Sequence, residues 1–190
     1  MSTQAAVQTP DEIINGVNVS ALKQTVEEVK NNPEIAKFRF RGKNVWLGGD
    51  SNRSTIKEFY GACQEHRVDA QPFVLENGEA PILLGLDKAA NPVEHLLSAL
   101  MGCMKTTLAY HAAARDIAID AIDTESEGEL DLRGFLGLSD SIRKGYQRIR
   151  VHMRVKSKAD PEQLRELTTF SPVYDVVSRS VPVDVAIETY

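Results

Sequence analysis

The sequence predicts an α+β protein, and two segments carry most of that prediction. Residues 148–156 alternate strictly between apolar and basic side chains, which is the period of a β-strand with one buried face. Residues 92–115 instead repeat apolar side chains every three or four positions, which is the period of a helix packed along one broad face. The predicted strands and helices do not alternate regularly along the chain, as they do in the βαβ units of a nucleotide-binding sheet, so an α+β class is expected.

The central helix has a clearly marked start. Asn91 suits the N-cap position, and Pro92 suits the first helical position because its missing N–H costs nothing there. Glu94 stands where a carboxylate can reach back to the cap. Beyond this start, the apolar side of the helix carries a cysteine, Cys103, in the same stripe as Leu100.

The first 35 residues are predicted to form an extension that precedes a main domain at 36–190. Residues 1–16 are polar and show no periodicity, which predicts an irregular arm. An accessory helix is predicted at 19–30 from the helical spacing of its apolar residues, and Pro33 ends it.

Between the extension and the central helix, the pattern predicts strands and one short helix. Alternating residues at 38–47 predict a half-exposed strand. Residues 54–66 place apolar side chains on one helical face, so a short helix is expected there. Two apolar runs, 72–76 and 82–86, flank the turn residues Asn77-Gly78 and predict a β-hairpin.

The C-terminal half predicts further strands and capped helices. Asp160-Pro161 and Ser171-Pro172 each place an N-cap residue before a proline, so each marks a helix start. In chain order we expect a strand at 117–130, a glycine-bearing connection at 132–145, the strand at 148–156, helices at 160–169 and 171–179, and a final strand at 181–187.

The charge balance excludes several classes of partner. The net charge is −5 and the pI is about 5.4. Because nucleic acids and anionic membranes favour clustered Lys and Arg, neither is an expected partner. No apolar run approaches the roughly 18 residues that a transmembrane helix requires. We therefore expect a cytoplasmic protein.

The cysteine and histidine counts limit the chemistry further. Two cysteines, Cys63 and Cys103, are too few for a disulfide framework or a four-thiolate zinc site. The four histidines show no metal-ligand spacing. We expect neither a metal nor a cofactor.

The helix that opens with Asn91-Pro92-x-Glu94 and carries Cys103, together with the Ser171-Pro172 helix near the C-terminus, resembles the OsmC/Ohr family of thiol-dependent peroxide reductases. The resemblance runs from about Phe38 to Tyr190. It implies two antiparallel sheets wrapped around central helices. It also implies an intertwined homodimer with active sites at the subunit interface.

The resemblance also implies site residues. In peroxidase members of the family, one cysteine of the central helix attacks the peroxide, and a second cysteine forms a disulfide with it. Cys103 matches the first cysteine, whereas Ser171 stands at the second position and cannot form a disulfide. The organic hydroperoxide branch often has a carboxylate directly after Asn-Pro, where this chain has Val93. An active-site arginine is implied as well, with Arg53 as the candidate and Arg41 as the alternative.

Several of these residues also have ordinary structural interpretations. Glu94 is expected to complete the helix cap, with the orientation of an arginine as the alternative. Ser171 suits an N-cap position without any chemical role. Tyr110 is either a core residue or part of a pocket wall. Cys63 is expected to fill space in its short helix, although it would serve as a displaced resolving thiol if it lay close to Cys103.

Two hypotheses of function follow. In the first, Cys103 reduces an organic hydroperoxide, Arg53 stabilises the thiolate and the leaving oxygen, and an external thiol restores the cysteine. In the second, the same dimer binds an apolar small molecule at its interface without turnover. The reactivity of Cys103 discriminates between them, because a mere pocket residue should label slowly at neutral pH.

Overall fold

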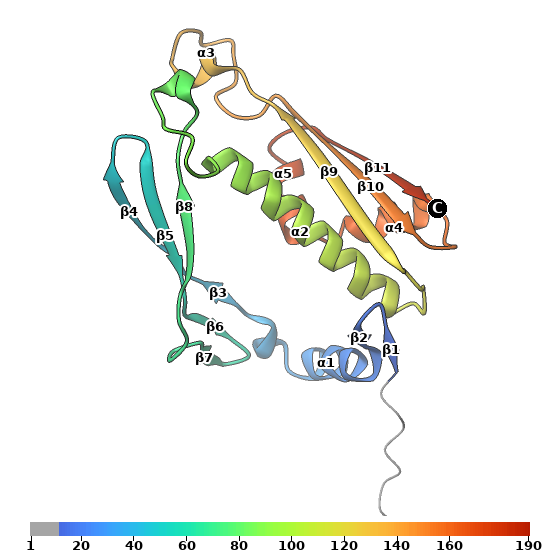
Figure 1. Ribbon diagram of the computed structural model, residues 1–190. Coiled ribbons are helices and arrows are strands. Elements are labelled where there is room, and N and C mark those ends of the chain that lie inside the picture. The colour runs from blue at the N-terminus through green and yellow to red at the C-terminus, as the bar shows by residue number, and fades with distance from the viewer. Residues whose placement is uncertain (1–11) are drawn as a thin grey trace, which may run out of the picture. The chain divides into compact units, whose positions relative to one another are not determined.

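The computed structural model describes residues 12–190, so residues 1–11 of the predicted arm lie outside the described residues. The chain divides into two compact units. Unit 1 contains residues 12–25 and 101–190, and unit 2 contains residues 26–100. Figure 1 labels the helices and strands of both units, which are described in turn.

Unit 1 is built on a three-stranded sheet. Its strands are β9 (Ala121–Glu129), β10 (Arg148–Lys156) and β11 (Val183–Thr189), in the order β11-β10-β9. β10 pairs antiparallel with β9 but parallel with β11. The expectation of purely antiparallel sheets is therefore wrong for this sheet. The reason is the connection between β10 and β11, which passes through two helices and returns the chain in the same direction.

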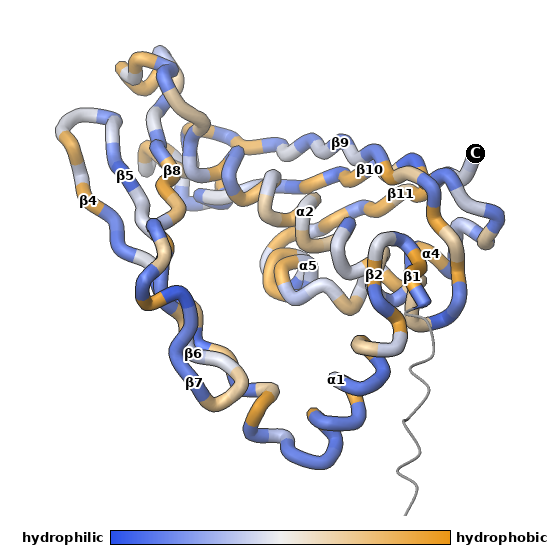
Figure 2. The backbone as a smooth tube through the Cα atoms, turned by 60° about the horizontal axis from the view of Figure 1, so that its bottom comes forward, coloured by the Kyte–Doolittle hydropathy of each residue, from blue (hydrophilic) through white to orange (hydrophobic). Residues whose placement is uncertain are grey.

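Those two helices and the central helix cover one face of the sheet. They are α4 (Pro161–Thr168), α5 (Pro172–Ser178) and the unit 1 part of α2 (Pro92–Ala113). Figures 1 and 2 both show them on the same side of β9, β10 and β11. The fully buried side chains of unit 1 include Met104 and Leu108 from α2, Leu164 from α4, and Ile149, Val151, Met153 and Val155 from β10.

The outer face of the sheet is a ladder of ion pairs. Arg148 lies 2.5 Å from Asp184 on β11, and Arg150 lies 2.7 Å from Glu127 on β9. Further along β10, Arg154 lies 3.1 Å from Glu188. Exposed pairs of this kind each contribute about 1 kcal/mol or less, so the basic stripe is a solvated face.

The N-terminal residues of unit 1 form a ribbon, β1 (Ile13–Ile14) and β2 (Val17–Asn18), followed by α1 (Val19–Asn31), which confirms the predicted accessory helix. Asn15 holds this ribbon to the chain that leaves α2. Its side-chain amide donates to the carbonyl of Ile117 at 2.9 Å and accepts from the N–H of Ile119 at 2.7 Å. One side chain thereby joins segments about 100 positions apart in the sequence.

Unit 2 consists of short strands in two three-stranded sheets. One sheet has the order β3-β6-β7 and the other the order β4-β5-β8. The elements of this unit besides parts of α1 and α2 are η1 (Pro33–Ala36), β3 (Arg39–Phe40), β4 (Lys43–Gly48), β5 (Ser51–Ile56), β6 (Phe59–Gly61), β7 (Gln64–His66), β8 (Phe73–Asn77) and η2 (Pro81–Leu83).

Three sequence predictions are wrong in unit 2. The single strand predicted at 38–47 is instead two strands, β3 and β4, which belong to different sheets because β3 pairs with β6 and β4 pairs with β5. The predicted helix at 54–66 is instead the end of β5 and the β6–β7 hairpin. Both turn residues of that hairpin, Ala62 and Cys63, have positive φ, so the chain reverses where a helix would continue. The predicted hairpin around Asn77-Gly78 does not form either. β8 pairs with β5, and the run at 82–86 is a 3₁₀ turn followed by loop.

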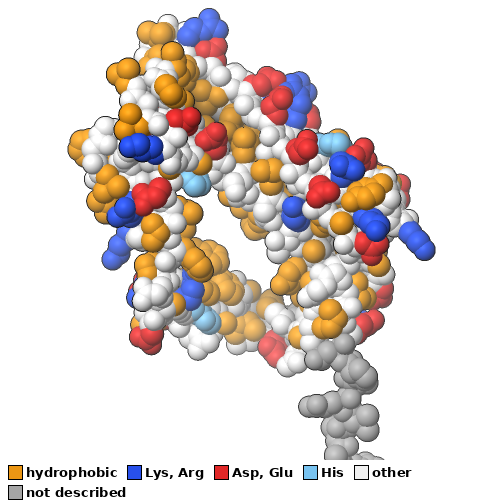
Figure 3. Space-filling view, viewed as in Figure 1, with side chains coloured by type: hydrophobic (Ala, Val, Ile, Leu, Met, Phe, Trp, Pro, Cys, Tyr) orange, Lys and Arg blue, Asp and Glu red, His pale blue; other side chains and the backbone are white. Residues whose placement is uncertain are grey.

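Hydrophobic side chains of unit 2 are largely exposed. Leu100 is the only one among residues 26–100 that is buried. Figure 3 shows many orange side chains at the molecular surface on the face it displays. The most exposed large side chains of unit 2 are Phe40, Trp46, Ile82 and Leu84, and Leu84 is 92% exposed.

The elements of the C-terminal half form where the sequence pattern predicts them, although β9 begins four residues later than predicted and β11 is shifted by two residues. β10, α4 and α5 match their predicted ranges to within three residues at each end, and the predicted connection at 132–145 contains one short helix, α3 (Leu132–Phe135). Within residues 12–190, no helix combines the length and apolar character needed to cross a bilayer.

Candidate active site

The predicted cap at the start of α2 is present in full. The N–H of Asn91 donates to the Glu94 carboxylate at 2.8 Å, and the N–H of Glu94 donates to the Asn91 side-chain oxygen at 2.9 Å. These two reciprocal bonds satisfy N–H groups that the helix itself leaves without partners. Glu94 is therefore a capping residue, and its carboxylate is already engaged.

Cys103 lies in the middle of α2, beside the stripe that faces the core. The next residue, Met104, is fully buried, whereas Cys103 itself is half-buried. At 100° per residue, Cys103 and Thr107 lie on the flank of that stripe. Both cysteines are free thiols, and Cys63 is exposed in unit 2 while Cys103 belongs to unit 1.

The same flank of α2 contacts the turn between α4 and α5. His111, two helical turns beyond Cys103, stacks on Phe170 with ring centroids 4.4 Å apart. Arg115 donates to His111 Nδ1 at 3.2 Å, which fixes the neutral tautomer with its proton on Nε2. Burial, and then the charge of Arg115, lower the pKa of His111 below its ordinary value.

Ser171 directly follows Phe170 and is fully buried. Its Oγ accepts a hydrogen bond from the N–H of Tyr174 at 3.2 Å and caps α5. The capping role expected from the sequence is therefore confirmed. Figures 1 and 2 both show α5 beside α2, so Ser171, the residue directly before α5, stands at the start of a helix that neighbours the Cys103 helix within unit 1.

Arg53 lies on β5 in unit 2, where its guanidinium is bonded to a carboxylate. Its Nε donates to Glu76 on β8 at 2.6 Å. The backbone carbonyl of Glu76 lies 3.1 Å from His95 Nε2, near the start of α2. The alternative arginine, Arg41, makes a bidentate pair with Glu65. The remaining predicted side chain, Tyr110, is 49% exposed and so is not part of the core.

One residue that organises this region was missed from the sequence. Asp50 follows Gly48 and Gly49, and its carboxylate accepts from the N–H of Leu86 at 3.1 Å and of Glu79 at 3.3 Å. These bonds lower the pKa of Asp50. They hold the loop that leads into α2, and an acidic residue directly after a glycine turn was the only signal available in the sequence.

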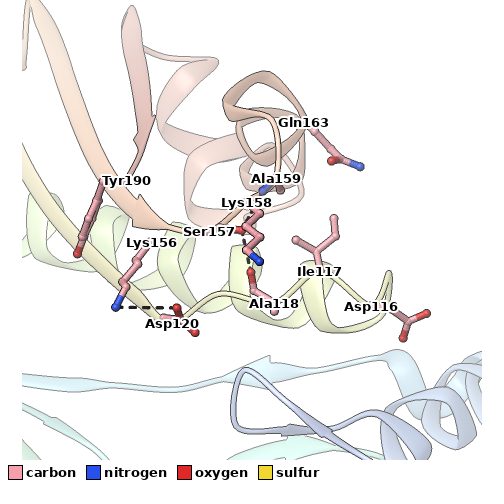
Figure 4. A pocket seen from close by; sticks show the side chains of 10 residues that line it. All are labelled: Asp116, Ile117, Ala118, Asp120, Lys156, Ser157, Lys158, Ala159, Gln163 and Tyr190. Carbon is pink, nitrogen blue, oxygen red and sulfur yellow. Dashed lines mark hydrogen bonds and ion pairs between the residues drawn. The ribbon is translucent and has the colours of Figure 1, made fainter.

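A cavity of about 890 Å³ lies elsewhere in unit 1 (Figure 4). Lys156 lies 4.0 Å from Asp120 at its edge, and the Ser157 hydroxyl donates to the carbonyl of Ala118 at 2.7 Å. The cavity begins after the end of α2, and about 15 Å of helix separates Cys103 from that end. It is therefore not part of the Cys103 environment.

No metal centre accompanies these residues in the described part of the chain. Among residues 12–190, no three His, Cys, Asp or Glu side chains lie close enough together to hold a metal ion.

Comparison with known proteins gives a consistent result. The family model described as OsmC-like protein matches residues 85–186, which include α2, Cys103 and Ser171. No curated protein matches the chain.

Solved structures match over most of the chain at low identity. An OsmC-like protein from Mycoplasma pneumoniae has 16% identity and a TM-score of 0.60, with 80% of this chain and 96% of that chain covered. An organic hydroperoxide resistance protein from Elizabethkingia anophelis, with thiocyanate bound, has 12% identity and a TM-score of 0.57, with 80% and 96% covered. An organic hydroperoxide resistance protein OsmC from Legionella pneumophila has 14% identity and a TM-score of 0.55, with 79% and 96% covered. At sequence identities this low, the structural similarity establishes the fold alone.

The environment of His111 predicts a pH dependence of stability. Because its pKa is lowered in the folded chain, the unfolded chain binds a proton more readily as the pH falls below about 6.5. The free energy of unfolding should therefore fall between about pH 7.5 and about pH 5.5, above the range in which carboxylates titrate. Urea unfolding of wild type and of His111→Gln should show a shallower pH dependence in the variant. His152→Gln, on the outer sheet face, is the control, and equal slopes for wild type and His111→Gln would contradict the assignment.

Proposed function

This chain belongs to the OsmC-like protein family, and on that premise we propose that it reduces organic hydroperoxides with Cys103 as the attacking thiol. The observation that carries the proposal is the position of Cys103, half-buried on a capped helix beside fully buried Met104 and Leu108. An apolar border of this kind suits an alkyl hydroperoxide better than hydrogen peroxide. The fold shared with organic hydroperoxide resistance proteins supports the same chemistry.

The proposed reaction has two stages. The Cys103 thiolate attacks the distal oxygen of R–O–O–H, so that the O–O bond breaks, a sulfenic acid forms on sulfur, and the alkoxide leaves and takes up a proton as the alcohol. An external thiol then attacks the sulfenic sulfur, releases water and forms a mixed disulfide. A second external thiol releases the Cys103 thiol, so two thiols are oxidised for each hydroperoxide reduced.

Ser171 explains why an external reductant is required. A hydroxyl cannot form a disulfide with a sulfenic acid, and the Ser171 oxygen serves as the cap of α5. Arg53 would supply the positive charge that stabilises the thiolate and the departing oxygen, with Glu76 and His95 holding its strand and side chain in position. Tyr110, seven positions after Cys103 on α2 and exposed, would line the approach to the sulfur.

The proposed site includes a second copy of the chain. Unit 2 contains folded strands but buries a single hydrophobic side chain, Leu100, and an exposed apolar surface of this kind supports the proposal that a partner covers it. The large exposed side chains Trp46, Ile82 and Leu84 belong to this surface. A homodimer would cover them and would bring the Cys103 region to a subunit interface.

Trapping of the sulfenic acid tests the role of Cys103. Reduced protein exposed briefly to stoichiometric tert-butyl hydroperoxide with dimedone should gain one adduct by intact mass. Cys63→Ser, which removes the exposed thiol, should gain the same adduct, whereas Cys103→Ser should gain none and should lose hydroperoxide consumption. An unmodified wild-type protein would instead favour the alternative function, an OsmC-like dimer that binds an apolar small molecule without turnover.

Restoring a second thiol tests the position of Ser171. We expect the S171C variant to lose two hydrogens after one equivalent of hydroperoxide, because a disulfide forms when the two Cα atoms lie within about 7 Å. The double variant S171C/C103S is the control and should keep its mass. Loss of the Ser171 cap costs about 1 kcal/mol, so folding of the variant is checked by circular dichroism. A stable sulfenic acid in folded S171C would show that this residue does not occupy the resolving position.

Light scattering tests the dimer. Wild type should have twice the 21.0 kDa mass of the chain. Leu84→Asp places a charge on the most exposed apolar side chain, at a positive φ that Asp tolerates, and should shift the protein toward the monomer. Ala186→Asp, on the polar outer face of the sheet, should leave the mass unchanged. A wild-type monomer at micromolar concentration would remove the interface from the proposal.

A further inference from the structure

A basic cavity in unit 2 contains neither Cys103 nor Arg53, although Arg41, the alternative arginine named above, is one of its lining residues. Its volume is about 600 Å³. All of its lining residues belong to residues 26–100, so its geometry is internal to one unit. They come from the link between β3 and β4, the first residue of β4, the end of β5, the two residues after β5 and the residue before β8: Arg41, Gly42, Lys43, Thr55, Lys57, Glu58 and Pro72.

The sign of the local charge is opposite to that of the whole protein. The chain carries a net charge of −5, but the cavity lining holds three basic side chains and one acidic one. The basic character extends along the sequence, because Asp50 is the only acidic residue between positions 37 and 57. The Lys and Arg residues in that range are Lys37, Arg39, Arg41, Lys43, Arg53 and Lys57. A concave site with this excess attracts anions.

The cations of the cavity differ in how far they are neutralised. Arg41 has both of its terminal nitrogens on Glu65, at 2.7 and 2.8 Å, so its charge is matched within the protein. Lys57 lies 3.2 Å from Glu58, and its side chain is 33% exposed. Lys43 makes no ion pair with any carboxylate in the described residues. One carboxylate therefore faces two lysines, and a positive charge remains.

We propose that this cavity binds the phosphate group of a small organic phosphate, with Lys43 and Lys57 as its charged contacts. Lysine binds phosphate oxygens as a compact charge with three donors, and the Thr55 hydroxyl adds a neutral donor on the same wall. The volume lies within the range of about 300 to 1,000 Å³ typical of ligand sites, and it is far larger than a phosphate ion requires. The organic part of the ligand would lie against Pro72 and the lysine stems.

Calorimetric titration with inorganic phosphate and with glycerol 3-phosphate, at about 0.1 M salt, tests the proposal. We expect saturable binding of both, and no binding of glycerol. The variant K43Q/K57Q should bind glycerol 3-phosphate at least tenfold more weakly, and each single variant should show part of that loss. Lys88→Gln, an exposed lysine of unit 2 outside the cavity, is the matched control and should bind as wild type does.

Three results would overturn the proposal: no saturable binding to wild type, equal binding by wild type and by folded K43Q/K57Q, or citrate binding more tightly than both phosphates. The single variants keep the test decisive if the double variant fails to fold. Hydroperoxide consumption by Cys103 involves none of these lysines, so failure here leaves the proposed peroxidase function untouched, and the reverse also holds.

Discussion

The packing of one helix stripe against one strand face holds unit 1 together. Met104, Leu108 and Ala112 of α2 and the inward residues of β10 are almost completely removed from solvent. Each fully buried side chain of the size of Met104, Leu108 or Val151 contributes about 1.5 to 3 kcal/mol, so this contact outweighs the exposed ion pairs on the other sheet face. It also determines where Cys103 lies, because a residue adjacent to Met104 must fall on the border between core and surface.

Patterns that depend on local chemistry could be predicted from the sequence. The strand at 148–156 was predicted to the residue, because its alternation reflects one buried and one solvated face. The start of α2 was predicted for a similar reason, since Asn91 and Glu94 satisfy each other's N–H groups within four residues. Capping at Ser171 is equally local.

Features that depend on distant partners could not be predicted. The segment 54–66 has a helical arrangement of apolar residues, but β5 pairs with both β4 and β8, and pairing of this kind overrides a weak local preference. The parallel pairing of β11 with β10 depends on the path of the chain through α4 and α5 rather than on a residue pattern. The bond between Arg53 and Glu76 joins strands 23 positions apart, so the engagement of this arginine was not visible in the sequence.

Unit 2 has almost no buried hydrophobic core of its own, and this affects the newly synthesised chain. Unit 1 can complete its core from its own residues. Residues 26–100 bury a single hydrophobic side chain and also hold five non-glycine residues at positive φ, of which the four other than Asp87 each cost about 1 kcal/mol or more. Under the proposed dimer, strands with exposed Phe40 and Trp46 remain available to chaperones and proteases until a second chain arrives. The time before a second chain binds depends on the concentration of the protein in the cell. A higher concentration therefore shortens the exposure of each new chain to proteases.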